Sequence, residues 1–356
     1  MNAGPPAALE LKVELQSQGI RVPGGLRSRA GGAGPADGIT LFIDELVATV
    51  PTGASYVERS PFSVRDAGGA FELLKDGRSL GEVRPAPDPA FYALETEGLE
   101  PYHKIALRHG RDGIGSTVAQ GCAHGADSCR FCAISLSKES GATLARKAPG
   151  ELAEVAAAAE GEGYAHIVLT TGTTGSEMGI AHMAECAASI RSHTGMRIHV
   201  QFEPPEDMGL IERVAQVSDS AAINIECFDR AVLENIAPGK ARTGLARYSN
   251  AWRKAVDAYG PGQVTSFIIL GLGESDESVL EGAKALASIG VYPFLVPLRP
   301  LRGTPLERWS PPESGRVTRL FEAAAATVQE ARLSASSCMA GCVRCGACSA
   351  ITDFTG

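Results

Sequence analysis

The sequence lacks the features that mark two large classes of protein. Its 33 lysine and arginine residues are outnumbered by 41 aspartate and glutamate residues, and the net charge is −8. A nucleic-acid partner is therefore not expected, because phosphate contacts need a basic surface. No apolar run approaches the roughly 20 residues that a membrane-spanning helix requires, so no membrane partner is expected either.

Neither a secretory leader nor a disulfide framework is expected. Residues 1–6 have neither a basic start nor an apolar stretch, and the nine cysteines are an odd number. We therefore expect reduced thiols and a cytoplasmic protein. The 356 residues, of which 44% are hydrophobic and 21% charged, have the composition of a globular protein and the length of one large domain with an appendage.

Three of the cysteines crowd into one loop of eleven residues directly after a predicted strand. They are Cys122, Cys129 and Cys132. Iron–sulfur clusters are held by thiolates at such short spacings, and Cys-x2-Cys is their commonest step. A [4Fe–4S] cluster needs four ligands. Three cysteines therefore leave one iron that is either open as a reaction site or bound by a ligand from another part of the chain. A zinc site in which His124 or Asp127 supplies the fourth ligand is the alternative.

A second group of thiols follows a predicted closing helix over residues 317–333. Its members are Cys338, Cys342, Cys345 and Cys348. The Cys-x2-Cys-x2-Cys rhythm is that of ferredoxins and predicts a second iron–sulfur cluster, for which a structural zinc site with four cysteine ligands is the alternative. A fully ligated cluster suits electron transfer. The remaining thiols, Cys186 and Cys227, lie in apolar stretches and are expected to be core residues.

From about residue 116 onward, predicted strands alternate with predicted helices. The strands are expected at 116–120, 166–170, 197–202, 221–226, 265–270 and 292–297, and the helices at 150–160, 178–192, 206–217, 250–258 and 276–288. Such alternation is typical of a parallel sheet built from right-handed β/α units. Six strands in roughly 180 residues predict an α/β fold with a partial (β/α)6 TIM-like barrel, because eight units need about 250 residues.

The chain is accordingly divided into three parts. Residues 1–112 are expected to form a small β-rich N-terminal segment with strands at 39–44 and 46–50, residues 113–310 the barrel, and residues 311–356 the closing helix and cysteine-rich tail. The glycine-rich loop at 24–35 has backbone amides that would suit an anion, but it lacks the Gly-Lys-Ser ending of a phosphate loop. A flexible surface loop is the alternative.

Polar residues follow the predicted strands, where the active sites of parallel β/α folds lie. Five such segments stand at 171–175, 203–206, 226, 271–274 and 297–305. Arg299 and Arg302 in the last segment suggest a substrate that bears a carboxylate or phosphate, because the guanidinium fork matches those groups. A surface or salt-bridge role is the alternative for both arginines.

Together, the cysteine loop and the strand ends resemble the radical S-adenosylmethionine (SAM) superfamily over about residues 116–310, and within it the biotin synthase and lipoyl synthase branch. The resemblance implies that the open iron of the cluster chelates SAM. It further implies that the reduced cluster splits SAM, and that the 5′-deoxyadenosyl radical takes a hydrogen atom from a small polar molecule. A reductant such as flavodoxin or ferredoxin is the implied partner.

The resemblance also assigns roles to individual residues. The three loop cysteines resemble the cluster ligands, with Phe131 as the aromatic residue before the last. Other segments resemble the family's SAM contacts. They are the turn after the second strand, the acidic residues after the third and fourth strands, a later basic stretch, and the glycines of the fifth strand. These positions are Thr171, Gly172, Thr173, Glu203, Glu226, Lys240, Arg242, Gly271 and Gly273.

One departure from the family pattern concerns the loop itself. The usual loop has three residues between the first and second cysteines, whereas six intervene here. The superfamily assignment survives this difference, but an assignment to biotin synthase itself does not. The extra residues include His124 and Asp127, which either reach the substrate or hydrogen-bond the loop.

The reaction type stays open at this level. The tail cluster would be consumed in sulfur insertion, or would take the leftover electron in a lyase or dehydrogenation reaction. The glycine-rich segment and the tail together also resemble a set of radical SAM proteins associated with nitrilases in bacterial gene clusters. A zinc-dependent hydrolase and a non-enzymatic iron–sulfur carrier are the competing functions.

Overall fold

The computed structural model describes residues 5–24, 26, 37–175, 177 and 179–355. The glycine-rich loop predicted at 24–35 lies almost entirely outside the described residues. In the remainder, two sheets are present, one of five strands and one of seven. None of the helices in the described ranges is both long and apolar enough to cross a membrane.

The N-terminal unit is a helix packed on a five-stranded antiparallel sheet with the order β2-β1-β5-β4-β3. Its core consists of apolar side chains from the helix and from alternate strand positions, among them Leu15, Leu41, Phe62 and Leu73, each of which is fully buried. The elements are α1 (Pro5–Gln18), β1 (Ile39–Ile43), β2 (Leu46–Val50), β3 (Phe62–Asp66), β4 (Phe71–Lys75) and β5 (Arg78–Pro85).

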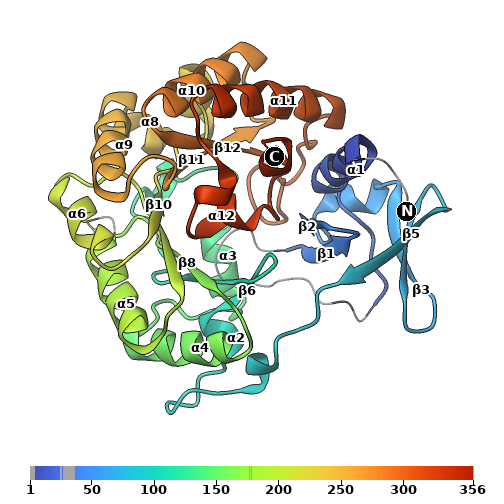
Figure 1. The fold of residues 1–356 in the computed structure, drawn as a ribbon, viewed down its shortest axis with the longest axis horizontal. Helices are drawn as coiled ribbons and strands as arrows, with labels where there is room; N and C mark the ends of the chain where they lie inside the picture. The colour runs from blue at the N-terminus through green and yellow to red at the C-terminus, as the bar shows by residue number, and fades with distance from the viewer. Residues whose placement is uncertain (1–4, 25, 27–36, 176, 178, 356) are drawn as a thin grey trace.

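The larger sheet is a curved half-barrel with the strand order β12-β11-β10-β9-β8-β7-β6. Strands β7 to β12 are parallel, and β6 pairs antiparallel with β7 at one edge. Figure 1 shows the helices around the outside of this curved sheet. The strands are β6 (Leu107–His109), β7 (Gly113–Thr117), β8 (His166–Thr170), β9 (Arg197–Gln201), β10 (Ser220–Ala222), β11 (Val264–Leu270) and β12 (Val291–Pro297).

The outer helices follow the strands in sequence and cover the outward face of the sheet. Each buried Val, Leu, Ile or Phe side chain in this layer contributes about 1.5–3 kcal/mol to stability. The helices are α4 (Pro149–Gly161), α5 (Ile180–His193), α6 (Gly209–Ala215), α7 (Arg230–Ile236), α8 (Pro238–Thr243), α9 (Leu245–Tyr259), α10 (Asp276–Ser288) and α11 (Ser314–Glu330), with two short helices, α2 (Tyr102–Ile105) and α3 (Ile134–Glu139), nearer the start of the barrel.

The partial barrel predicted from the sequence is confirmed, with two local differences in its strands. The first strand was expected at 116–120 and is β7 (Gly113–Thr117). The fourth was expected at 221–226, but β10 ends at Ala222. The backbone ladder to β11 is interrupted after Ala222, where the Phe267 amide donates to the Asn224 side chain at 3.1 Å and the Ile225 amide donates to the Ser266 hydroxyl at 3.2 Å.

The inner face of the half-barrel is polar near the carboxyl ends of its strands. Strand pairing sets Thr117, Thr170 and Gln201 side by side, and the two threonine hydroxyls lie 2.8 Å apart. Thr170 and Gln201 are partly exposed, whereas their neighbours Leu169 and Val200 are fully buried under the outer helices. The inward-facing side chains therefore line a space that solvent reaches.

The C-terminal tail folds back across the opposite, amino-terminal end of the strands. In Figure 1 the helix α12 (Gly341–Cys345) lies inside the ring of outer helices. The Ser220 hydroxyl, at the start of β10, donates to the Ala340 carbonyl, and Arg344 pairs with Asp112 just before β7. The tail thus closes the lower end of the half-barrel before it ends in α13 (Ile351–Phe354).

Candidate active site

The cysteine loop lies over the carboxyl ends of β8 to β10. The Ala123 amide donates to the Thr173 carbonyl at 2.6 Å, and the Arg130 amide donates to the Ile236 carbonyl at 2.8 Å. A Cβ at Gly172 would stand only 1.6 Å from the Gly121 carbonyl oxygen. This approach is possible only for glycine, so the turn after β8 and the loop fit together without a side chain between them.

The loop thiols interact electrostatically in two pairs, Cys129 with Cys132 and Cys132 with Cys122. Cys122 and Cys129 are partly buried and Cys132 is exposed. Desolvation raises the pKa of Cys129, and the nearby Cys132 raises it further. Desolvation also raises the pKa of Cys132, and there the nearby Cys122 adds to the rise. The Ser128 hydroxyl lies 3.5 Å from the Cys122 Sγ and donates to it.

Such a donor set fits an iron–sulfur cluster, which takes closely grouped thiolates on one loop. Because iron binds the thiolate form of cysteine, cluster binding at this loop would release protons. Phe131, between the last two cysteines, packs against the barrel core. Within the described ranges, no three side chains of His, Cys, Asp or Glu converge on a point that would hold a single metal ion.

A buried ion cluster lies directly beside the loop. Its centre is Lys240 in α8, whose Nζ donates to the Asn224 carbonyl at 2.5 Å and lies 3.2 Å from Glu226 Oε1 and 3.8 Å from Glu203 Oε1. Burial lowers the pKa of Lys240, but the nearby Tyr248, Glu226 and Glu203 outweigh burial and raise it well above the usual value. Lys240 is therefore a fixed positive charge.

The two carboxyl groups of this cluster have opposite proton affinities. Burial raises the pKa of Glu226, and Lys240 opposes that rise without cancelling it. Burial also acts to raise the pKa of Glu203, but Lys240, His124 and Thr173 outweigh it and lower the pKa. Glu203 is thus held as a carboxylate, and Glu226 takes up a proton more readily than an ordinary glutamate. Neighbouring carboxyl groups with divergent pKa values are typical of functional sites.

Glu226 also carries backbone strain. Its φ of 73° lies in the left-handed region that non-glycine residues rarely adopt, at a cost of about 1–3 kcal/mol. The neighbouring strand imposes this conformation, since the Glu226 amide donates to the Phe267 carbonyl at 3.0 Å and the Ile269 amide donates to the Glu226 carbonyl at 2.8 Å. The strain was not visible in the sequence, because no local pattern there marks a left-handed glutamate.

The extra residues of the loop attach it to the barrel. His124 Nε2 lies 2.9 Å from Glu203 Oε2, and a Cβ at Gly239 would meet the His124 ring at 2.4 Å. Asp127 forms an ion pair with Arg242 at 2.8 Å. Of the two roles that the sequence allowed for His124 and Asp127, these contacts favour holding the loop.

The glycine turn after β11 is built around a carboxylate that sequence reasoning did not single out. Glu274 Oε1 accepts from the Gly271 amide at 2.9 Å and Glu274 Oε2 from the Leu272 amide at 2.7 Å. Arg316 of α11 pairs with the same side chain at 2.9 Å. Gly271 and Gly273 have φ values of 103° and 107°, so their positions require glycine.

Arg299 and Arg302 contact the N-terminal unit. The Arg299 Nη2 donates to the Thr49 carbonyl at 2.6 Å. The Arg302 Nε donates to the Gly53 carbonyl at 2.6 Å, and its Nη2 pairs with Glu58 at 2.6 Å. Arg302 therefore forms a salt bridge with Glu58, whereas the partner of Arg299 is a backbone carbonyl.

The four tail thiols do not share the site of the loop. Cys338, Cys342 and Cys345 are buried and Cys348 is partly buried, on the closed end of the half-barrel. Desolvation raises the pKa of Cys345 to about 11, and the neighbouring Cys348 contributes. A Cβ at Gly110 would stand 2.0 Å from the Cys345 Sγ, so the chain before β7 leaves room for that sulfur. Cys345 and Cys348 are thus close enough to interact, and all four thiols stand in one segment of eleven residues, the kind of ligand that an iron–sulfur cluster takes.

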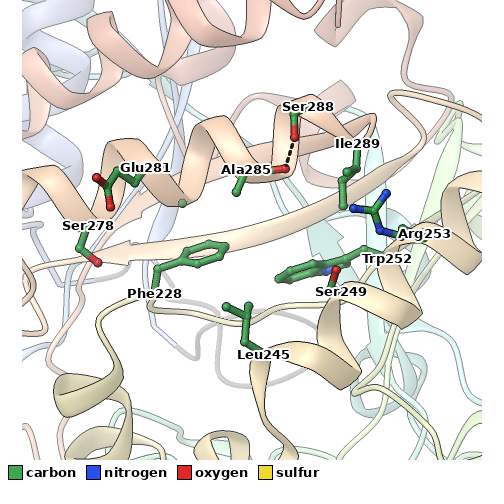
Figure 2. A pocket seen from close by; sticks show the side chains of 11 residues that line it. Phe228, Leu245, Ser249, Trp252, Arg253, Ser278, Glu281, Ala285, Ser288 and Ile289 are labelled. Carbon is green, nitrogen blue, oxygen red and sulfur yellow. Dashed lines mark hydrogen bonds between the residues drawn. The ribbon is translucent and has the colours of Figure 1, made fainter.

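A groove of about 450 Å³ lies elsewhere, on the outer layer between α9 and α10 (Figure 2). The Phe228 and Trp252 rings form its floor with their centroids 6.1 Å apart, and Leu245 and Ile289 lie at its sides. The loop cysteines do not line it. The groove is therefore separate from the cysteine loop and its neighbouring ion cluster.

Parts of the chain are similar to known proteins. Residues 116–286 match the Radical SAM superfamily. Over 122 residues the chain is 32% identical to the bacteriochlorophyllide c C-7(1)-hydroxylase of Chlorobaculum limnaeum. That match covers 33% of this chain and spans only 30% of the length of the hydroxylase.

Two solved structures are similar to part of the chain. A crystal structure of HydG, a maturase of the [FeFe]-hydrogenase, superposes with a TM-score of 0.50 at 16% identity, covering 61% of this chain and 50% of that one. A crystal structure of methylornithine synthase (PylB) gives a TM-score of 0.48 at 16% identity, covering 61% and 62%.

Proposed function

Residues 116–286 of this chain form a radical SAM domain, and on that premise we propose that Cys122, Cys129 and Cys132 hold its [4Fe–4S] cluster. With SAM bound and an electron supplied, such a cluster splits SAM and yields a 5′-deoxyadenosyl radical that abstracts hydrogen from a substrate. The observation that carries the proposal is the position of the loop, which joins the turn after β8 and the end of α7 through the Ala123 and Arg130 amides.

We further propose that the buried ion cluster receives the methionine part of SAM, which carries both an amino and a carboxylate group. Lys240 supplies a fixed positive charge for the carboxylate and Glu203 a fixed negative charge for the amino group. The turn at 171–173 adds backbone groups beside them. Arg242 is paired with Asp127 at 2.8 Å, so its part is to hold the loop.

For the adenine end of SAM, we propose the turn that includes Gly271 and Gly273. The Glu274 carboxylate fixes this turn by accepting from two backbone amides, and Arg316 fixes the carboxylate in turn. A turn held in this way presents its remaining backbone groups in a constant geometry, which lowers the entropy cost of binding a ligand.

The tail supports a second proposal, that Cys338, Cys342, Cys345 and Cys348 hold an auxiliary cluster whose role is electron transfer. Three of these thiols are buried, and a cluster with four cysteine ligands has no open position for a substrate. Sulfur donation would require the cluster to be dismantled beneath the packed tail. The substrate on this proposal is a small polar molecule that enters the space beside Thr170 and Gln201.

Two iron–sulfur clusters imply a one-electron donor such as flavodoxin or ferredoxin, and a reducing compartment. All nine cysteines are free thiols, which agrees with the cytoplasm, where disulfides are rare. We propose that location for the enzyme.

Anaerobic reconstitution of the full chain tests the proposal. We expect about eight irons per chain, the content of two [4Fe–4S] clusters, and production of 5′-deoxyadenosine once SAM and a strong reductant are added. A protein that retains zinc at one ion per chain and leaves SAM intact would instead support the hydrolase alternative. Bound iron without SAM cleavage would support the carrier.

A further inference from the structure

One tail thiol differs from the others in what surrounds its sulfur. Cys342 Sγ lies 3.6 Å from Nε2 of His109, the last residue of β6, and 3.9 Å from Nε2 of Gln201, the last residue of β9. Both distances are within hydrogen-bonding range for sulfur. Two side chains from separate strands of the half-barrel therefore meet at a single cysteine of the tail.

The chemistry of a metal-bound thiolate decides the direction of these contacts. A thiolate bound to iron has no proton, so it can only accept hydrogen bonds. The Gln201 amide nitrogen is a donor, and a neutral His109 fills the same role when its proton is on Nε2. His109 is only 2% exposed, so water does not compete for its ring.

Two neighbouring histidines fix α12 so that Cys342 meets these donors. Arg344 Nη1 donates to His166 Nδ1 at 2.8 Å. The Ser220 hydroxyl donates to the Ala340 carbonyl at 3.2 Å, and His199 Nδ1 donates to the Ser220 oxygen at 2.8 Å. The helix is thus held on both sides of Cys342 by bonds that do not involve its sulfur.

Gln201 also connects this sulfur with the interior of the half-barrel. Its side chain belongs to the inner face, in register with Thr170, and both residues are partly exposed. Cys342 is therefore the tail thiol that faces the space where the proposed substrate would lie, whereas the Cys345 sulfur faces the chain at Gly110.

We propose that His109 and Gln201 are positioning residues that donate hydrogen bonds to the Cys342 thiolate and raise the reduction potential of the tail cluster. This proposal rests on the proposed auxiliary cluster. Hydrogen bonds to the sulfurs of a cluster tune its potential. They raise it because the reduced cluster carries one more negative charge, which the N–H groups stabilise.

The test uses the full chain with the three loop cysteines replaced by alanine, so that the tail is the only cluster site. The midpoint potential is measured by electron paramagnetic resonance during a redox titration. We expect His109→Leu and Gln201→Leu each to lower the potential, with a roughly tenfold change in the ratio of reduced to oxidised cluster, or about 59 mV for one electron. His109→Gln, which keeps an N–H donor, should recover part of the loss.

His182 offers a matched control, because its Nε2 lies 3.7 Å from Cys186 Sγ, a thiol outside both groups. His182→Leu should leave the potential unchanged. An equal shift in that variant, or unchanged potentials in His109→Leu and Gln201→Leu with full iron content, would overturn the proposal. If the His109→Leu variant loses its iron, the midpoint potential of the Gln201→Leu variant alone tests the proposal. A parent protein that binds no iron at all would refute the auxiliary cluster itself, a result distinct from a potential that does not move.

Discussion

Lys240 Nζ lies 3.2 Å from Glu226 Oε1. Lys240 belongs to the helix α8, and Glu226 to the loop that follows strand β10. The lysine ammonium group is buried, so protein groups and not water must stabilise its charge. Its carbonyl partner, Asn224, and its two carboxyl neighbours hold it at the mouth of the half-barrel, beside Cys129. This contact links the ion cluster to the cysteine loop.

Replacing Lys240 with methionine should weaken SAM binding by about 10- to 100-fold, because a charged hydrogen bond in a buried site is worth about 1.5–3 kcal/mol. Equilibrium dialysis with the reconstituted protein measures the affinity. Lys254→Met is the matched control, since Lys254 also pairs with a glutamate, Glu212, but at the surface. Equal affinity in Lys240→Met and the wild type would remove Lys240 from the site.

Replacing Cys129 with alanine should abolish reductive SAM cleavage and lower the iron content by about four, because the loop would keep only two ligands for its cluster. The tail iron should remain. Cys186→Ala is the control for loss of a buried thiol outside the loop. Undiminished 5′-deoxyadenosine formation in Cys129→Ala would contradict the ligand assignment.

Replacing Cys345 with alanine should have the complementary effect. The tail cluster of this variant would lose one ligand, so the iron content should fall by about four. SAM cleavage at the loop should continue. Iron analysis and 5′-deoxyadenosine production, measured on the same preparation, separate the two sites. An iron content equal to that of the wild type would show that the tail does not bind iron through Cys345.

Asp219 gives a stability prediction with a defined pH dependence. Burial acts to raise its pKa, but the Ile198 amide, Arg191 and Arg197 outweigh burial and lower it. The unfolded chain therefore binds the proton more readily than the folded protein, and the carboxylate adds stability above its unfolded pKa of about 3.9.

Asp219→Asn should accordingly reduce the free energy of unfolding by about 1–3 kcal/mol at pH 7. The difference from the wild type should shrink as the pH falls below about 4, because the unfolded wild-type chain then takes up the proton before the folded protein does, which removes the stabilisation by the carboxylate. Denaturant unfolding at several pH values measures this. A difference that stays constant down to pH 3 would contradict the assignment.

Several parts of the fold were readable from the sequence because they depend on local spacing. The 2-residue period of the strands and the 3.6-residue period of the helices act over a few neighbours, so β8, β2 and α10 lie at the predicted residues. β7 and β10 differ from their predicted bounds. The early end of β10 follows from side-chain hydrogen bonds at Asn224 and Ile225 with the adjacent strand β11, which local sequence does not reveal.

The sequence by itself determined the cysteine loop, the order of β/α units and the resemblance to the radical SAM superfamily, since each is a matter of residue type and short spacing. Only the tertiary structure decided which distant charges meet. It brought Lys240 to Glu203 and Glu226, paired Arg299 and Arg302 with the N-terminal unit, and set Cys342 between His109 and Gln201. Contacts between residues far apart in the chain follow from how the elements pack, and local sequence patterns carry no record of that packing.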